Sequence, residues 1–183
     1  QDMPGVRRVV NLGNAVAIVA DGYWQAKQAL DRLDVEFERN GNESIGQSDL
    51  FSQFTADMDA ATANGNEIRD FAMGDTEAAI AGADKVVEAE YRVPFLAHAT
   101  MEPMTCTAWI HDGICELWAG TQNPLGFAAE VADVLDMDVD DVLLHNNYLG
   151  GGFGRRALPD YAIQAARIAA EVPYPIKLIW SRE

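Results

Sequence analysis

Four glycines within five positions, interrupted by one phenylalanine and followed by two arginines, constrain this chain more than any other feature. The sequence of residues 150–156 is GGGFGRR. Glycine loses more backbone freedom on folding than any other residue, so ordering such a run needs a structural reason. The usual reasons are backbone angles that only glycine tolerates and a close approach that a Cβ atom would block. Because arginine presents a forked positive charge suited to phosphate or carboxylate, the run predicts the approach of a polar, anionic ligand. A flexible turn is the simpler alternative.

The segments on either side of the glycines predict a strand, a loop and a helix. Residues 142–149 have the pattern of a strand, and residues 158–170 that of a helix with Pro159 near its start. A loop in this position presents backbone N–H groups to an anion. The spacing is not that of a Walker loop, because no Gly-Lys-Ser/Thr follows, and it is not the Rossmann glycine pattern. The glycine run therefore does not match the glycine-rich motifs that bind nucleotides.

The rest of the hydrophobic pattern predicts a mixed α and β fold. Strands are expected at residues 14–19, 35–37, 86–94, 105–110, 114–119 and 176–181, and helices at 23–33, 48–61, 76–83 and 124–137.

The two cysteines lie on a predicted hairpin whose turn is Asp112-Gly113. Pairing Ile110 with Cys115 places Cys106 opposite Ala119. The two sulfur atoms would then be roughly 13 Å apart along the strands, too far for a disulfide. Both cysteines are therefore expected to be small buried hydrophobic residues, and they indicate neither a metal site nor a redox compartment.

The net charge of −16 opposes binding of nucleic acid or of an anionic membrane surface. No apolar run reaches the about 18 residues of a membrane-spanning helix. The chain starts at Gln1 without an initiator methionine and stops at Glu183 directly after a strand-like run. We expect it to be a piece of a longer polypeptide, and bacterial cytoplasm and periplasm both stay open as its compartment.

Several polar residues outside the glycine run are candidates for chemistry. His98 and Glu102 could form a metal pair on a helix, but Pro103 disfavours helical geometry at Glu102. A structural role, in which Glu102 accepts backbone N–H bonds, is an equal alternative to catalysis. Asn123 is expected to cap the helix that starts at Pro124, which leaves Gln122 free to point at a ligand. For the two remaining histidines we expect solvation at His111 and a structural role at His145.

Three motifs together resemble the molybdenum-binding subunit of the xanthine dehydrogenase and aldehyde oxidase family. They are His-x-x-x-Glu-Pro at 98–103, Gly-Thr-Gln-Asn-Pro at 120–124 and the glycine run, in that order. The arginine-ended run and residues 99–104 are most similar to the isoquinoline 1-oxidoreductase beta-subunit branch. The resemblance covers essentially the whole chain, and its specificity lies in the combination.

The resemblance implies an α+β fold with three parts. Residues 1–40 are similar to the end of an α/β hammerhead domain, 41–70 form a connecting segment, and 71–183 correspond to the truncated first part of a molybdopterin-binding domain.

The resemblance also assigns cofactor contacts. Gln122 matches a glutamine that hydrogen-bonds near the metal, and a neutral amide can do this without adding charge. Phe153 and Gly154 match a loop that lies against the cofactor, and Gly151 and Gly152 let that loop approach. Arg155 is part of the same set, and no residue here is expected to bind the metal directly.

The implied chemistry is hydroxylation of an aldehyde or an N-heterocycle with oxygen derived from water. The implied cofactor is molybdenum held by molybdopterin, in the cytosine dinucleotide form. The implied partners are a small [2Fe-2S] subunit and the remainder of the molybdenum subunit. The protein would orient and tune a cofactor that supplies the difficult chemistry.

The chain departs from the family pattern at one position and stops before another. Purine-oxidising members carry a glutamate at the place of Ala157, so purine recognition is not expected. The family's catalytic glutamate lies near the end of the full subunit, so no catalytic residue is expected here, and neither Glu102 nor Glu183 is assigned that role. We expect the isolated chain to fold but to hold no cofactor and to be inactive.

In the isolated chain the glycine run would face water, with Arg155 and Arg156 solvated. The alternatives are a stand-alone phosphate- or nucleotide-binding module and an interaction scaffold without a small-molecule site.

Overall fold

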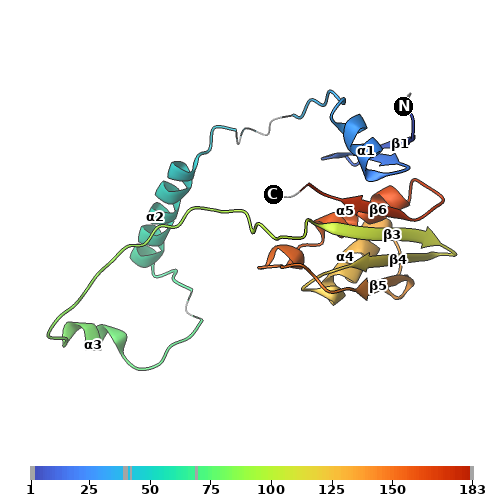
Figure 1. Ribbon diagram of the computed structural model, residues 1–183. Coiled ribbons are helices and arrows are strands. Elements are labelled where there is room, and N and C mark those ends of the chain that lie inside the picture. The colour runs from blue at the N-terminus through green and yellow to red at the C-terminus, as the bar shows by residue number, and fades with distance from the viewer. Residues whose placement is uncertain (1–2, 39–40, 42, 69, 182–183) are drawn as a thin grey trace. The chain divides into compact units, whose positions relative to one another are not determined.

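The computed structural model confirms the mixed α and β architecture (Figure 1). It describes residues 3–38, 41, 43–68 and 70–181. The chain divides into two compact units, which are described separately. The first consists of Gln1–Val35 and Ala97–Glu183, and the second of Glu36–Leu96.

A four-stranded sheet with the order β5-β4-β3-β6 forms the centre of the first unit. Its strands are β3 (Thr105–His111), β4 (Ile114–Ala119), β5 (Val142–Asn146) and β6 (Ile176–Ile179). β3 pairs antiparallel with β4 and with β6, whereas β4 and β5 are parallel. A helical crossover joins the parallel pair, as such a connection requires.

The register predicted for the hairpin is confirmed. Ile110 pairs with Cys115, and Cys106 pairs with Ala119. Asp112 and Gly113 both have positive φ, at 50° and 82°, as a two-residue hairpin turn demands. Both cysteines are free and buried, as the pairing predicted.

Two helices, α4 (Pro124–Leu135) and α5 (Asp160–Ala169), cover one face of this sheet (Figure 1). Asn123 caps α4, as predicted, by accepting a hydrogen bond from the Gly126 N–H at 3.2 Å. Alanines on α5 allow it to approach the sheet closely, and Phe127 packs edge-on against Tyr161 with ring centroids 5.4 Å apart. The core between the layers consists mainly of Cys106, Ala108, Cys115, Leu117, Phe127, Val131, Val142, Tyr161, Ala162, Ala165, Ala166 and Ile176.

A two-stranded sheet completes the first unit. It pairs β1 (Val6–Asn11) with β2 (Val16–Ala20), and α1 (Tyr23–Leu30) follows. Val10 and Val19 from this hairpin are buried in the same core. β1 is not apparent from the sequence pattern, because Arg7 and Arg8 interrupt its apolar residues. In the structure these arginines pair with Asp21 and Glu171.

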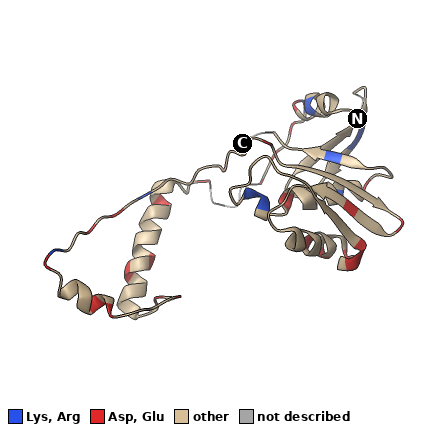
Figure 2. Cartoon of the chain, turned by 60° about the horizontal axis from the view of Figure 1, so that its bottom comes forward, with Lys and Arg blue, Asp and Glu red and all other residues tan. Residues whose placement is uncertain are grey.

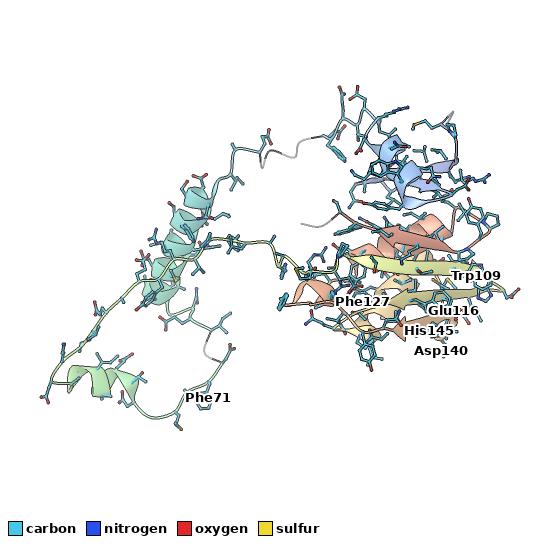
Figure 3. The ribbon with its side chains drawn as sticks, viewed as in Figure 1. Phe71, Trp109, Glu116, Phe127, Asp140 and His145 are labelled. Carbon is cyan, nitrogen blue, oxygen red and sulfur yellow. The ribbon has the colours of Figure 1, made fainter. Side chains whose placement is uncertain are left out.

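The second unit contains two helices, α2 (Gln47–Asn64) and α3 (Thr76–Ala81). α2 ends at Gly65, whose φ of 63° gives the left-handed cap that glycine favours. Phe54 packs edge-on against Phe95, but Phe71 is 79% exposed (Figure 3). Neither helix buries a residue, so this unit has little core of its own.

The strands predicted at 35–37 and 86–94 are wrong, because both segments lack regular secondary structure. Alternating apolar residues form a strand only where a partner strand supplies hydrogen bonds. Within the described part of Glu36–Leu96 there is no such partner. None of the helices that the structure describes has the length and apolar character needed to cross a membrane.

Candidate functional site

Two loops begin at the same edge of the four-stranded sheet. Because β4 and β5 are parallel, their carboxyl ends lie side by side, where open α/β sheets commonly bind ligands. Residues 120–123, here called the amide turn, follow β4, and residues 147–154, the glycine loop, follow β5. Asn146 joins them, since its Oδ1 accepts from the Thr121 N–H at 3.0 Å and its Nδ2 donates to the Thr121 carbonyl at 3.3 Å.

A third segment, which contains Glu102, holds the start of the glycine loop. The Gly150 N–H donates to Glu102 Oε2 at 2.7 Å, and the Glu102 N–H donates to the Gly150 carbonyl at 3.3 Å. Of the two roles left open by the sequence, these bonds match the structural one. A Cβ atom at Gly150 would lie 2.6 Å from Glu102 Cβ, so only glycine allows this approach.

The guanidinium of Arg156 is fully buried beneath these segments. It donates from Nε to the Gly151 carbonyl at 2.8 Å and from Nη2 to Glu102 Oε2 at 2.9 Å. The carbonyl of Gly120 accepts from Arg156 Nη1 at 3.5 Å and from the Tyr161 hydroxyl at 2.7 Å. Burial raises the pKa of Tyr161 to about 12, so this hydroxyl keeps its proton at neutral pH.

Arg155 points to a different partner. Its guanidinium binds Asp160 through two hydrogen bonds and lies 5.1 Å from the ring centroid of Trp180. Both arginines lie on η2 (Arg155–Ala157), a short blue turn in Figure 2. Both side chains are buried. The expectation that Arg155 and Arg156 would be solvated is therefore wrong. Each guanidinium faces a carboxylate, at Asp160 or Glu102, that the local sequence pattern did not connect to it.

The glycine loop adopts left-handed backbone angles. Gly151, Phe153 and Gly154 have φ values of 95°, 54° and 93°. Phe153 is an uncommon case, because a residue with a Cβ atom is strained in this region. Its side chain is 74% exposed.

Within the described residues, the N–H groups of Gly151, Gly152 and Phe153 have no hydrogen-bond acceptor. Successive N–H groups in a chain with alternating backbone angles form concavities that bind anions. The predicted exposure of backbone donors thus has a structural counterpart in this loop.

Gln122 extends from the amide turn to the glycine loop. Its Oε1 accepts from the Gly154 N–H at 3.1 Å, and a Cβ atom at Gly152 would lie 2.4 Å from the same oxygen. Gly152 is thus required for this contact. Oε1 is engaged by the loop, and the Nε2 group of the exposed amide can donate to a ligand. His98 lies nearby, with Nε2 4.0 Å from the position of a Cβ at Gly154.

A second polar cluster lies on the uncovered face of the sheet (Figure 3). Glu116 accepts from His145 at 2.7 Å and lies 3.3 Å from His111, and each histidine stacks on a tryptophan, His111 on Trp109 and His145 on Trp118. The prediction that His111 is simply solvated is wrong, because three side chains contact it. The structural role expected for His145 agrees with its contacts.

In the described part of the chain, no three His, Cys, Asp or Glu side chains are arranged so that they could hold a metal ion. Glu183 lies outside the described residues. A cavity of about 1040 Å³ with a mainly apolar lining lies between β2, α1 and β6, and none of its lining residues belongs to the glycine loop or the amide turn. The amide turn and glycine loop are therefore the best-supported candidate site.

Sequence reasoning missed four side chains that support this site: Glu102 as the partner of Arg156, Asn146, Tyr161 and Asp160. Only Asp160 carried a signal, because it lies five residues after Arg155 at the start of a helix. The others act across 25 to 54 residues of sequence.

A glycine loop with exposed N–H groups, facing a neutral amide at the ends of parallel strands, is the geometry of domains that bind an anionic cofactor. A family model described as "Molybdopterin cofactor-binding domain" matches residues 59–183, and the chain belongs to this family. The resemblance found in the sequence is thereby confirmed.

Relatives of known function are similar along nearly the whole chain. The beta subunit of isoquinoline 1-oxidoreductase from Brevundimonas diminuta is 30% identical over 100% of this chain and 24% of its own length. The molybdenum-binding subunit of an aldehyde oxidoreductase from Escherichia coli (strain K12) is 27% identical over 90% of this chain and 22% of its own.

The crystal structure of quinoline 2-oxidoreductase from Pseudomonas putida 86 matches 99% of the chain and 28% of its own length. Its TM-score is 0.66 at 18% identity, which shows a shared fold. The chain thus spans about a quarter of the length of these relatives.

Proposed function

We propose that this chain is part of the molybdenum-binding subunit of a hydroxylase that oxidises aldehydes or N-heteroaromatic compounds. When bound, the molybdopterin cofactor would supply the metal chemistry that places oxygen from water on the substrate carbon. The observation that carries the proposal is the Gln122–Gly154 hydrogen bond. It sets the Gln122 amide donor beside three backbone N–H groups that have no acceptor among the described residues. These groups fit an anionic cofactor that brings its own metal ligands.

In this proposal six residues contact the cofactor. Gly151 and Gly152 leave room for it to approach the backbone, and Phe153 and Gly154 present their backbone to it. Gln122 donates from Nε2, and Arg155 places positive charge at the end of the glycine loop. Because two hydrogen bonds to Asp160 hold the Arg155 guanidinium in place, we infer that it would contact the cofactor as a fixed positive charge rather than as a mobile side chain.

The finer domain assignment is also a proposal. Residues 1–40 would be the end of an α/β hammerhead domain, 41–70 a connecting segment and 71–183 the first part of the cofactor-binding domain. The β1–β2 hairpin and α1 would be the described part of that first domain. They have their own two-stranded sheet, but Val10 and Val19 share a core with the four-stranded sheet. We infer the cytosine dinucleotide form of the cofactor from the sequence resemblance alone.

The proposed partners are a small [2Fe-2S] subunit, which accepts electrons, and the remainder of the molybdenum subunit. The catalytic glutamate would come from that remainder. Until the second wall of the site is added, the exposed glycine loop is open to water, which weakens its electrostatic interactions. The isolated chain is therefore expected to hold no molybdenum and to lack activity.

The test is production of the full subunit with its iron–sulfur partner in a host that makes the cofactor. We expect molybdenum near one atom per subunit, oxidation of benzaldehyde or isoquinoline with an electron-accepting dye, and incorporation of ¹⁸O from labelled water. The Gln122→Leu variant should lose turnover by about 10- to 100-fold, as expected when a group that tunes a metal site is removed.

The matched control is Glu130→Gln on the exposed side of α4, which should behave as the wild type. A full subunit that binds inorganic phosphate or a nucleotide, but neither molybdenum nor molybdopterin, would overturn the proposal in favour of a phosphate-binding module.

A further inference from the structure

The buried guanidinium of Arg156 connects several segments of the candidate site. Its side chain donates to carbonyl groups of three separate segments: Glu102 and Pro103, Gly120, and Gly151. The contacts with Glu102 and Gly120 bridge 54 and 36 residues of sequence. One side chain thus fixes the amide turn, the glycine loop and the segment before β3 relative to one another.

The charge of this guanidinium has a single carboxylate partner among the described residues, Glu102. The Oε2 atom of Glu102 accepts at once from Arg156 Nη2 at 2.9 Å and from the Gly150 N–H at 2.7 Å. The ion pair therefore transmits the position of Arg156 directly to the first glycine of the loop. The neighbouring pair, Arg155 with Asp160, contacts the start of α5 instead.

The backbone of Arg156 is hydrogen-bonded to the amide turn, on the other side of the site from the glycine loop. Its carbonyl accepts from the Thr121 hydroxyl at 2.9 Å and from the Gln122 N–H at 3.1 Å. The side chain is bonded to the loop and the main chain to the turn, so a single residue sets the separation between them. That separation decides whether Gln122 Oε1 can reach the Gly154 N–H.

We propose that Arg156 and Glu102 are a positioning pair for the cofactor site. Together they set the distance between the glycine loop and Gln122. The inference rests on the proposed function for its consequence in the loaded enzyme, but the loop geometry itself can be tested without cofactor. Lysine cannot replace Arg156, because one ammonium group on a flexible stem does not reproduce the planar fork that serves four carbonyl groups and a carboxylate.

The first test uses the full subunit with its partner, made without molybdate, and measures amide hydrogen exchange in the peptide that covers residues 147–156. Arg156→Lys and Glu102→Gln should each accelerate exchange there by about tenfold or more under conditions where the protein stays folded. Val131→Ala is the matched control, because it removes buried side-chain volume on α4 without touching the loop. It should lower the melting temperature and leave exchange at 147–156 unchanged.

The second test uses the subunit made in a cofactor-producing host. For Arg156→Lys and Glu102→Gln we expect molybdenum content to fall about tenfold, in the range seen when supporting residues of metal sites are changed. In the loaded fraction, kcat per molybdenum should fall more than KM changes, and the electron paramagnetic resonance signal of the metal should shift. Val131→Ala should leave that signal and kcat per molybdenum unchanged.

Wild-type exchange at 147–156 in both Arg156→Lys and Glu102→Gln would overturn the positioning pair. A lowered melting temperature of these variants, with an unchanged resonance signal and unchanged kcat per molybdenum, would also overturn it. That pattern is expected of an arginine with a purely structural role. If the wild-type subunit holds no molybdenum, the proposed function fails. The exchange measurement still decides whether Arg156 and Glu102 fix the position of the glycine loop.

Discussion

Arg155 and Asp160 are joined by two parallel hydrogen bonds, 3.0 Å from Nη1 to Oδ1 and 2.8 Å from Nη2 to Oδ2. The Arg155 side chain is only 8% exposed, whereas that of Asp160 is 46% exposed. Asp160 also accepts from the Tyr161 N–H at 3.0 Å, in the first turn of α5. The pair therefore fixes the point where the glycine loop ends and the helix begins.

Asp160→Asn should destabilise the protein by about 1–2 kcal/mol. The substitution removes a charge-assisted pair from a nearly buried guanidinium, and the half-exposed carboxylate reduces the loss. Urea unfolding followed by circular dichroism measures the change. Glu130→Gln, at an exposed position on α4, is the control and should leave the unfolding midpoint unchanged. Equal midpoints for wild type and Asp160→Asn would contradict this account.

Gly152→Ala should disrupt the candidate site while leaving most of the fold intact. The added methyl group would lie 2.4 Å from Gln122 Oε1, so either the amide or the loop must move. We expect molybdenum content of the full subunit to fall by about tenfold or more. Gly46→Ala, where a Cβ meets nothing closer than 3.5 Å, is the control. Normal molybdenum content in Gly152→Ala would show that the Gln122 contact is dispensable.

The cluster on the open face of the sheet predicts a pH dependence of stability. The hydrogen bond to Asp112, followed by that to Glu116, raises the pKa of His111 above its ordinary value of 6.5. The hydrogen bond from His145, followed by that from His111, lowers the pKa of Glu116 below its ordinary 4.5. Stabilisation by His111 is complete below pH 6.5 and is lost as the pH rises through its folded pKa.

Stabilisation by Glu116 is complete above pH 4.5 and is lost as the pH falls through its folded pKa. The combined contribution is therefore greatest between pH 4.5 and 6.5. Urea unfolding of wild type and Glu116→Gln across pH should show the largest difference in that window. A difference that grows steadily from pH 6.5 to 9 would reverse the predicted sign.

The two cysteine thiols should be unreactive in the folded protein. Burial raises the pKa of Cys106 to about 12 and that of Cys115 to about 11, so almost no thiolate is present at pH 8. Titration with Ellman's reagent should detect neither thiol in the native state and both in 8 M urea, with the urea sample as the control. Rapid native labelling of both thiols would contradict the burial.

Substrate preference should exclude purines. Ala157 cannot hydrogen-bond a purine edge, and a missing partner of this kind costs about 1–3 kcal/mol. The full enzyme should therefore show kcat/KM for xanthine about tenfold or more below that for benzaldehyde or isoquinoline. Ala157→Glu should narrow the difference, and comparable wild-type values for xanthine and isoquinoline would refute the preference.

The parts of the fold predicted correctly from sequence are those in which local residues determine the structure. The Asp112-Gly113 turn determined the hairpin register, and Asn123 with Pro124 marked the start of α4. In contrast, the segments 35–37 and 86–94 were predicted as strands on alternation alone. A strand depends on a neighbour that the local sequence does not specify.

At the candidate site the sequence identified the residue types but not their partners. The glycines marked the loop, and Gln122 was expected to be free to face a ligand. The structure adds that Gln122 is oriented by the Gly154 N–H, and that Glu102 neutralises Arg156 from 54 residues away. Such pairings arise when the sheet assembles, so no window of neighbouring residues contains them.

The parallel pairing of β4 and β5 also affects how such a domain can diversify during evolution. Exposed positions after the two strands, such as Ala157 and Leu158, can mutate singly, because the sheet beneath is complete without them. Glu102 and Arg156 cannot change independently in this way, since the fully buried guanidinium of Arg156 depends on the Glu102 carboxylate as its charge partner. Descendants of one ancestor can therefore acquire new substrates through the loop ends while inheriting this pair together.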